Sequence, residues 1–244
     1  NVRILNNHCD YYMVTPVNIF SIITLKIEGL VLQGNYPGEG FDDLLMLADA
    51  WTFDISGLEV RDQINLGGKG IIKFASFSQT VKLRLTNCVF ENNKVAKGGL
   101  LQIYNIHSVL IEDTTFKQTE AKENSSCIYF YGVEMASLTI KRCVFEDNST
   151  SMGGVIDLQN FLKVLVDSTK FLRNSSTKTS GVLSVVGEVK LGVLLEISNC
   201  TFSENKGDVA ASLYVECSNA IQIVISNCEF SHNQGVMGTI LYVV

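Results

Sequence analysis

From residue 81 onward, apolar and polar positions recur with a period of about 28 residues. Apolar pairs such as Leu83/Leu85 and Leu138/Ile140 stand seven and five residues before a phenylalanine. The six phenylalanines, spaced by 26, 29, 26, 31 and 28 residues, are Phe90, Phe116, Phe145, Phe171, Phe202 and Phe230. Because alternation with a period of two is typical of a strand with one buried face, the pattern predicts a strand before each phenylalanine.

Two further features follow each phenylalanine. An asparagine stands three residues later in five of the six repeats, at Asn93, Asn148, Asn174, Asn205 and Asn233, and Thr119 takes this place in the sixth. Eight to ten residues after the phenylalanine comes a pair of small residues, such as Gly98-Gly99, and then a second alternating segment, such as Leu101/Ile103. Each repeat is therefore predicted to hold at least two strands, with a short third strand around the phenylalanine.

Repetition of residue identity favours a coil over a β-sandwich. In a coil, equivalent residues of successive turns stack about 4.8 Å apart, so that each turn needs the same shape at the same place. Phenylalanine then stacks on phenylalanine, and each asparagine amide bonds to the next from a left-handed corner position. The expected fold class is all-β: a parallel β-helix, or solenoid, of about 8 to 9 coils of about 28 residues.

Residues 1–80 fit the same 28-residue pattern less closely. Its positions are filled by Leu25, Ile27, Leu30, Leu32 and Asn35, then by Phe53, Ile55, Leu58, Val60 and Gln63, and Val2 to Ile4 fit the remnant of a ninth coil. Residues 1–244 are therefore predicted to form a single β-helix domain, with degenerate coils over 1–80 and six regular coils over 81–244. Residues 36–50 break the rhythm and are predicted as an inserted loop or a short helix beginning near Leu44. The uncapped apolar end at Val243-Val244 indicates a fragment of a longer solenoid.

Two motifs resemble those of a known family. Phe90-Glu91-Asn92-Asn93 and Phe145-Glu146-Asp147-Asn148, with Gly98-Gly99-Leu100-Leu101 and Gly153-Gly154-Val155-Ile156, resemble the FxxN and GGA[ILV] repeats of the polymorphic outer-membrane proteins of chlamydiae, in the pectin-lyase-like superfamily. Similar repeats occur in surface proteins of protists. The resemblance covers about two thirds of the chain, although half of the turns replace the glycine pair by Ser-Gly, Ala-Ala or Ser-Ser. It implies a right-handed β-helix exposed at the cell surface, with a role in adhesion.

Composition and net charge limit the kinds of partner that the chain is expected to bind. A hydrophobic content of 46% is that of a folded chain, and 19 Lys plus Arg against 25 Asp plus Glu give a net charge of −6. A nucleic-acid partner is not expected, because the basic surface that neutralises phosphates is missing. No run of about 18 apolar residues could cross a bilayer, so the sequence predicts membrane attachment only through parts outside this chain.

The acidic residues do not show the catalytic patterns of the pectin-lyase-like fold. Its lyases hold Ca²⁺ with clustered aspartates and its hydrolases use paired carboxylates, whereas Glu112, Glu146 and Asp157 are expected in different outward columns. The sequence therefore predicts no catalytic residue, metal or cofactor, and favours a non-catalytic extracellular or cell-surface scaffold that is structural or adhesive. A polysaccharide lyase or hydrolase and a glycan-binding module stay open as alternatives. The expected partners are adjoining coils of the same or a neighbouring chain, other surface proteins, or glycans.

The cysteines and the glycosylation sequons complete the candidate sites. Cys88, Cys143, Cys200 and Cys228 stand two residues before a phenylalanine, where threonine stands in other repeats, and are expected to be buried fillers. Cys200 and Cys228 lie on adjacent turns, within reach of a disulfide, so a bond or two thiols both fit. Sequons occur at Asn124, Asn148, Asn174 and Asn199. Asn124 and Asn199 are the better candidates, because an inward-pointing ladder would leave Asn148 and Asn174 no room for a glycan.

Overall fold

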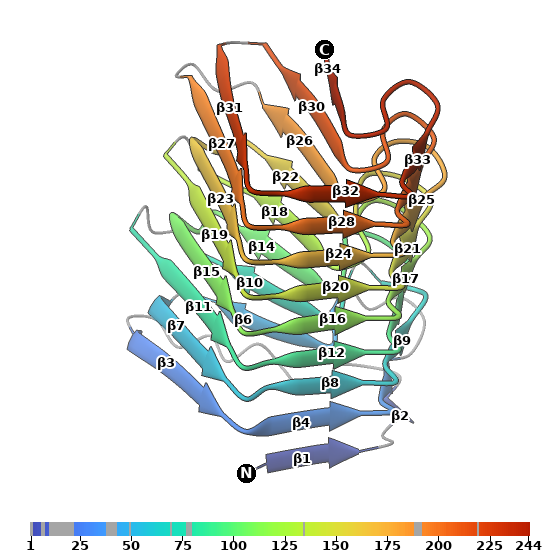
Figure 1. Ribbon diagram of the computed structural model, residues 1–244. Helices are drawn as coiled ribbons and strands as arrows, with labels where there is room; N and C mark the ends of the chain where they lie inside the picture. The colour runs from blue at the N-terminus through green and yellow to red at the C-terminus, as the bar shows by residue number, and fades with distance from the viewer. Residues whose placement is uncertain are drawn as a thin grey trace.

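The computed structural model describes residues 2–5, 8–9, 22–37, 43–48, 50–68, 70–76, 80–133, 135–187, 192–218 and 220–244. These residues form a parallel β-helix whose turns stack from the N-terminal to the C-terminal end (Figure 1). Each turn runs through four parallel sheets, which we call C, A, E and D in the order in which the chain passes through them. The described part of the chain contains no helix, and therefore no helix that is long and apolar enough to cross a membrane. The shortest of the four main sheets has seven strands, which gives about seven full turns, slightly fewer than predicted.

Sheets C and A contain the apolar pairs and the phenylalanines, which confirms the strands predicted there. The eight strands of sheet C are β3 (Ile22–Glu28), β7 (Ala50–Ser56), β11 (Lys82–Thr86), β15 (Ser108–Glu112), β19 (Ser137–Lys141), β23 (Lys163–Asp167), β27 (Val193–Ser198) and β31 (Ile221–Ser226). The nine strands of sheet A are β1 (Val2–Leu5), β4 (Leu30–Gln33), β8 (Glu59–Arg61), β12 (Val89–Glu91), β16 (Thr115–Lys117), β20 (Val144–Glu146), β24 (Lys170–Leu172), β28 (Thr201–Ser203) and β32 (Glu229–Ser231).

Sheets E and D complete each turn. The two-residue strands of sheet E, which the sequence did not reveal, are β9 (Ile64–Asn65), β13 (Lys94–Val95), β17 (Glu120–Ala121), β21 (Ser149–Thr150), β25 (Ser175–Ser176), β29 (Lys206–Gly207) and β33 (Gln234–Gly235). Near the N-terminus, β2 (His8–Cys9) and β5 (Tyr36–Pro37) pair as a separate sheet. Sheet D holds β6 (Leu45–Ala48), β10 (Ile72–Ala75), β14 (Leu101–Tyr104), β18 (Ile128–Tyr131), β22 (Ile156–Gln159), β26 (Leu183–Gly187), β30 (Leu213–Cys217) and β34 (Leu241–Val243).

A column of stacked phenylalanine rings runs through the core behind sheet A. From Phe90 to Phe230, the centroids of successive rings lie 4.8, 4.7, 5.1, 4.7 and 4.7 Å apart, with interplanar angles of 18° or less. Parallel register continues the column downward, because Phe90 pairs with Val60 and Val60 with Leu32. Ile4 pairs with Leu32 in turn, which confirms the predicted remnant of a further coil at the N-terminus.

The described residues within 36–50 lie mostly in strands, unlike the inserted loop or short helix that the sequence predicted. Within this segment, Tyr36 and Pro37 form β5, and Leu45 to Ala48 form β6, the first strand of sheet D. Leu45 and Leu47 are buried and pair with Ile72 and Phe74, so they fill the same core positions as in later turns. The helix predicted from Leu44 is therefore wrong, because the run of leucines that resembles a helical face is a strand covered by the next turn. Residues 38–42 and 49 lie outside the described residues.

Candidate functional site

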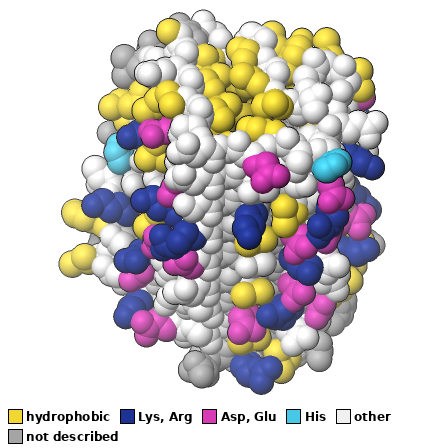
Figure 2. All heavy atoms as spheres, viewed as in Figure 1, with side chains coloured by type: hydrophobic (Ala, Val, Ile, Leu, Met, Phe, Trp, Pro, Cys, Tyr) yellow, Lys and Arg dark blue, Asp and Glu magenta, His cyan; other side chains and the backbone are white. Residues whose placement is uncertain are grey.

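A polar groove lies at the corner between sheets A and E. It has a volume of about 670 Å³, spans the turns from β4 to β21, and is lined by side chains that include Gln33, Arg61, Glu91, Lys94, Glu120 and Asp147. We call it the corner groove. Positive and negative side chains are mixed over this face, whereas hydrophobic side chains gather over its C-terminal end (Figure 2). The chemistry of the groove therefore depends on how these charges are paired.

Two columns of left-handed residues flank the strands of sheet A from β4 onward and position their outward side chains. One column precedes the strand and includes Asn87 at φ 54°, and the other follows it and includes Asn92 at φ 53° and Asp147 at φ 55°. Short polar side chains such as Asn and Asp tolerate this conformation best. The sequence prediction placed the left-handed corner at the ladder asparagines, one residue too late. Asn93 and Asn148 have ordinary backbone angles, and the residue before each of them makes the corner.

The ladder asparagines lie on the inner side of this corner. Asn148 donates its amide hydrogens to the Phe116 carbonyl (3.0 Å) and to Asn174 Oδ1 (3.0 Å), while its backbone N–H donates to the same oxygen (3.1 Å). The pattern repeats from Asn174 to Asn205 and from Asn205 to Asn233. Every polar atom of a buried amide is thus used, which meets the requirement that buried polar groups be hydrogen-bonded. The predicted inward ladder is confirmed for these residues, and it forms the wall behind the corner groove.

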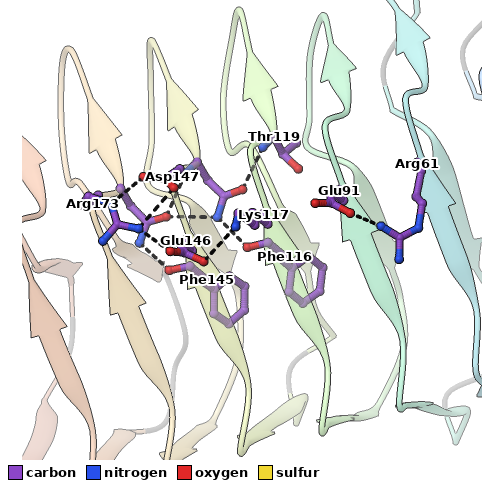
Figure 3. Close-up of polar contacts among 11 residues, drawn as sticks. Arg61, Glu91, Phe116, Lys117, Thr119, Phe145, Glu146, Asp147 and Arg173 are labelled. Atoms are coloured by element: carbon purple, nitrogen blue, oxygen red, sulfur yellow. Dashed lines mark hydrogen bonds and ion pairs between the residues drawn. The ribbon is translucent and has the colours of Figure 1, made fainter.

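Outside the ladder, opposite charges alternate from one rung to the next. The column one residue after the phenylalanine reads Arg61, Glu91, Lys117 and Glu146, which pair in register along sheet A. Arg61 contacts Glu91, and Lys117 Nζ lies 3.5 Å from Glu146 Oε2 (Figure 3). The acids named in the sequence prediction, Glu112, Glu146 and Asp157, lie in different columns, on sheets C, A and D. Glu91, which that prediction did not include, shares the column of Glu146, with a lysine between them.

Arg173 closes this network at the next rung. Its guanidinium contacts Glu146, and its Nε donates to Asp147 Oδ1 at 2.8 Å (Figure 3). The opposite corner of sheet A repeats the arrangement with Arg142, which is 2.7 Å from Asp113 Oδ1 and 2.8 Å from Glu112 Oε1. The hydrogen bonds from Arg142 lower the pKa of Asp113. The nearby guanidinium thus favours the charged form of Asp113.

One carboxylate differs from those in the ion pairs. Asp157 on β22 points outward from sheet D, yet it is only 7% exposed, and burial raises its pKa from 3.8 to about 6. Its neighbours across the sheet are Tyr129 and Ser184, and the Ser184 hydroxyl bonds to it, while Asp157 Oδ1 has no partner. A buried carboxyl without a cationic partner is most stable when it is protonated.

We expect Asp157 to make the folded protein less stable as the pH rises from 4 to 7. The pKa of Asp157 is higher in the folded than in the unfolded state. The carboxyl therefore does not change the free energy of unfolding at pH values below its unfolded-state pKa, and it lowers that free energy at pH values above its folded-state pKa. A shift from 3.8 to about 6 corresponds to roughly 3 kcal/mol at neutral pH. Asp157→Asn should therefore gain up to about 3 kcal/mol over the wild type at pH 7.5 and nothing at pH 4, measured by urea unfolding. An equal difference between the two proteins at both pH values would contradict this assignment.

The cysteines predicted as fillers form part of a second inner column. Cys88 and Cys143 are 1% exposed, and their backbone N–H groups donate to Thr114 Oγ1 and Thr169 Oγ1 of the next rung, each at 3.3 Å. Cys200 donates in the same way to Cys228 Sγ at 3.5 Å. Both Cys200 and Cys228 are free thiols in the structure, so the disulfide between them stays a prediction. The column shows why cysteine and threonine alternate, since each offers a small side chain with one acceptor atom.

Thiol labelling tests this arrangement. Burial raises the pKa of the Cys143 and Cys200 thiols to about 12, and only the thiolate reacts. Cys217 and Cys228 are half-buried. We expect an aromatic disulfide reagent to modify Cys217 and Cys228 in the native protein, and Cys88, Cys127, Cys143 and Cys200 only in urea, as read by peptide mass spectrometry. Labelling of Cys143 as fast as Cys228 would be inconsistent with the buried column, and a Cys200–Cys228 cross-linked peptide from unreduced protein would confirm the disulfide.

The structure divides the four sequons into two groups. Asn148 and Asn174 are 0% exposed and use their Nδ2 atoms in the ladder, so they are wrong as glycosylation sites in the folded protein. Asn124 is half-buried at a left-handed corner, and Asn199 is exposed at another, with Nδ2 2.9 Å from Asp167 Oδ1. Asn199 lies in the corner before β28. Glycosylation at Asn124 and Asn199 stays a prediction.

The fold and the groove define a class: a parallel β-helix with repeated inner ladders and a charge-paired outer corner. The family model of the right-handed β-helix region matches residues 70–242, so the chain belongs to the right-handed β-helix family. Among the residues that the structure describes, no three His, Cys, Asp or Glu side chains lie together as a metal site.

The chain is also similar to part of a receptor-like protein. The metabotropic glutamate receptor-like protein Q of Dictyostelium discoideum is 27% identical over 157 residues, which cover 62% of this chain and 13% of that protein. The chain thus matches only a small part of this relative's length. No solved structure matches the chain.

Proposed function

We propose that the chain is a non-catalytic structural or adhesive β-helix scaffold at the extracellular or cell surface. The observation that carries this proposal is the pairing of the groove carboxylates, since Glu91 contacts Arg61 and Glu120 Oε2 lies 3.2 Å from Lys94 Nζ. A glycosidase needs one carboxyl that stays protonated as the general acid beside a second carboxylate. The groove carboxylates are instead held as charge partners of basic side chains on adjacent rungs. The charges of the corner groove therefore fit a role in joining neighbouring turns.

Two observations support the proposed location. The Dictyostelium relative is named as receptor-like, and a β-helix within such a protein fits a surface module. Asn124 and Asn199 supply sequons outside the buried ladder, as a secreted glycoprotein would require. The resemblance of the repeats to those of chlamydial polymorphic outer-membrane proteins favours the same location.

The C-terminal end of the rod supports an adjoining coil, of the same or a neighbouring chain, as a partner. Hydrophobic side chains gather there, with Val236 79% and Met237 63% exposed (Figure 2). Strands β31 to β34 lie at the edges of their sheets and present backbone groups of the kind that pair with another strand. A coil of the same repeat would continue each column in register, as each coil inside the rod does for its neighbour.

A depolymerisation assay tests the proposal against a polysaccharide lyase or hydrolase. The protein is incubated with polygalacturonate, xylan and chitin oligomers, with and without Ca²⁺, and reducing ends and unsaturated products are measured. We expect no products. Turnover that is lost in Glu91→Gln but retained in Glu196→Gln, a half-buried outward residue of sheet C, would establish an enzyme and overturn the proposal. The Glu196 variant serves as the matched control, because it removes one outward carboxylate away from the groove.

A further inference from the structure

The outward face of sheet D carries five tyrosines in two groups. Tyr104 on β14 pairs in register with Tyr131 on β18, and the rings of Tyr104 and Tyr129 lie 5.9 Å apart. Further along the rod, Tyr214 on β30 stacks on Tyr242 on β34 with ring centroids 6.0 Å apart. We call these five residues the tyrosine strip. They lie on a different face from the corner groove, and the scaffold role assigns them no task.

Smaller side chains separate the two groups of rings. The rungs between them present Asp157 and Gln159 on β22, then Ser184 and Val186 on β26. Tyr131 is 39% exposed and the other four tyrosines are half-buried. Aromatic surface therefore faces solvent on both sides of the rungs that carry the smaller side chains. Successive rungs of a parallel sheet are about 4.8 Å apart, close to the length of one pyranose unit in an extended glycan. The strip thus has the spacing of a surface along which sugar rings stack.

Two buried oxygens beside Tyr129 lack partners. Gln102 and Asp157 pair in register with Tyr129 from the rungs on either side, and neither Gln102 Oε1 nor Asp157 Oδ1 accepts a hydrogen bond. Gln102 is fully buried and Asp157 is 7% exposed. Unsatisfied buried groups reduce stability, and in native proteins they concentrate where a sequence serves function. The two oxygens therefore mark the rungs around Tyr129 as a place selected for more than stability.

The charges on this face indicate the kind of ligand. Across the described strands of sheet D, Lys73 is the one basic residue, and its Nζ lies over the Tyr104 ring at 5.3 Å. The acids of the face are Asp157 and Glu216, and Glu216 accepts a hydrogen bond from the Tyr214 hydroxyl at 2.7 Å. A polyanionic glycan would be attracted by one basic side chain and repelled by two carboxyl groups on this face. A neutral glycan would instead contact aromatic rings, a hydroxyl group and side-chain amides. The balance of charge thus favours a neutral partner.

We propose that the tyrosine strip binds a neutral, unbranched oligosaccharide that lies along the rod axis. Its sugar rings stack on Tyr104 and Tyr131 at one end and on Tyr214 at the other, and the small residues between them leave room for the chain. Aromatic faces bind the apolar faces of sugar rings, and polar neighbours such as Gln159 bind their hydroxyls. This inference rests on the proposed non-catalytic surface function and gives that adhesive role its ligand class.

Calorimetric titration with cellohexaose, xylohexaose, chitohexaose and a galacturonate hexamer tests the inference. We expect saturable binding of at least one neutral hexamer, roughly tenfold weaker in Tyr131→Ala and unchanged in Tyr131→Phe, which keeps the ring. Trp51→Ala is the matched control, because Trp51 is 61% exposed on sheet C, away from the strip. Circular dichroism confirms that each variant is folded.

Three results would overturn the inference: no binding of any neutral hexamer, binding of the galacturonate hexamer alone, or equal weakening in Tyr131→Ala and Trp51→Ala. Cleavage of a hexamer during the titration, detected by mass spectrometry, would instead contradict the proposed non-catalytic function. Failure of the ligand assignment and failure of the scaffold role are therefore told apart in one experiment.

Discussion

Asn174→Leu is expected to lower the free energy of unfolding by roughly 3 to 6 kcal/mol, although leucine has nearly the same shape as asparagine. Asn174 Oδ1 accepts from both nitrogens of Asn148, and its Nδ2 donates to the Phe145 carbonyl (2.9 Å) and to Asn205 Oδ1 (3.1 Å). Leucine removes all four bonds, so the buried backbone N–H of Asn148 and one hydrogen of its side-chain amide lose their acceptor, and the Phe145 carbonyl loses this donor. Each buried group left unsatisfied costs about 1 to 3 kcal/mol.

Urea unfolding followed by circular dichroism measures this loss. Thr201→Val is the matched control, because it also replaces a polar residue by an apolar one of the same shape, at a half-buried outward position on β28. We expect the control to change stability by less than about 0.5 kcal/mol. If Asn174→Leu were no more harmful than Thr201→Val, the ladder would not stabilise the rod.

Phe145→Ala is expected to cost about 4 to 6 kcal/mol, at the centre of the phenylalanine column. The Phe145 ring is fully buried between those of Phe116 and Phe171, with centroids at 4.7 and 5.1 Å. Alanine leaves a cavity in a core whose neighbouring rungs are held in register and relax little. It also removes two stacked pairs, each worth roughly 0.5 to 1.5 kcal/mol beyond burial.

Phe145→Leu provides the comparison. Leu32 and Val60 fill this column in the first turns, so the site accepts an aliphatic side chain when the adjoining turns are shaped for it. We expect Phe145→Leu to lose about half as much stability as Phe145→Ala in the same urea titration. A loss under about 1 kcal/mol for Phe145→Ala would mean that the column does not carry the core.

The sequence predicted those parts of the fold in which one residue type recurs at one position. The phenylalanine column, the inward asparagines and the apolar pairs of sheets C and D all lie where the 28-residue period placed them. Stacking explains this, because each rung must match its neighbours in shape. Even Leu32 and Val60, which lack the aromatic ring, could be placed from their spacing alone.

Other parts left no such signal. The strands of sheet E are two residues long, as in Lys94–Val95, which is too short for alternation to be read. The leucines of β6 were mistaken for a helix, because four consecutive apolar or small residues do not distinguish a helix from a strand. The left-handed corners were placed one residue late, since an asparagine suits both a corner and a buried ladder.

The candidate sites were the least predictable part. The ion pairs of the corner groove join residues 26 to 30 positions apart, such as Arg173 with Asp147 and Arg61 with Glu91. Once the register is known, these pairs follow from a shared column. From the sequence alone, insertions of a few residues between turns shift the columns and hide the alternation of charge. The burial of Asp157 was hidden for another reason: a position that faces outward on a strand is normally exposed.

The central claim is that the recurring inward residues hold the rod together and leave the outward columns free for function. Urea unfolding of four alanine variants from a single turn tests it most directly. Val166→Ala and Phe171→Ala remove buried inward side chains, and Leu165→Ala and Leu172→Ala remove half-buried outward ones. We predict losses above about 2 kcal/mol for the inward pair and below about 1 kcal/mol for the outward pair. Outward losses as large as the inward ones would contradict the account.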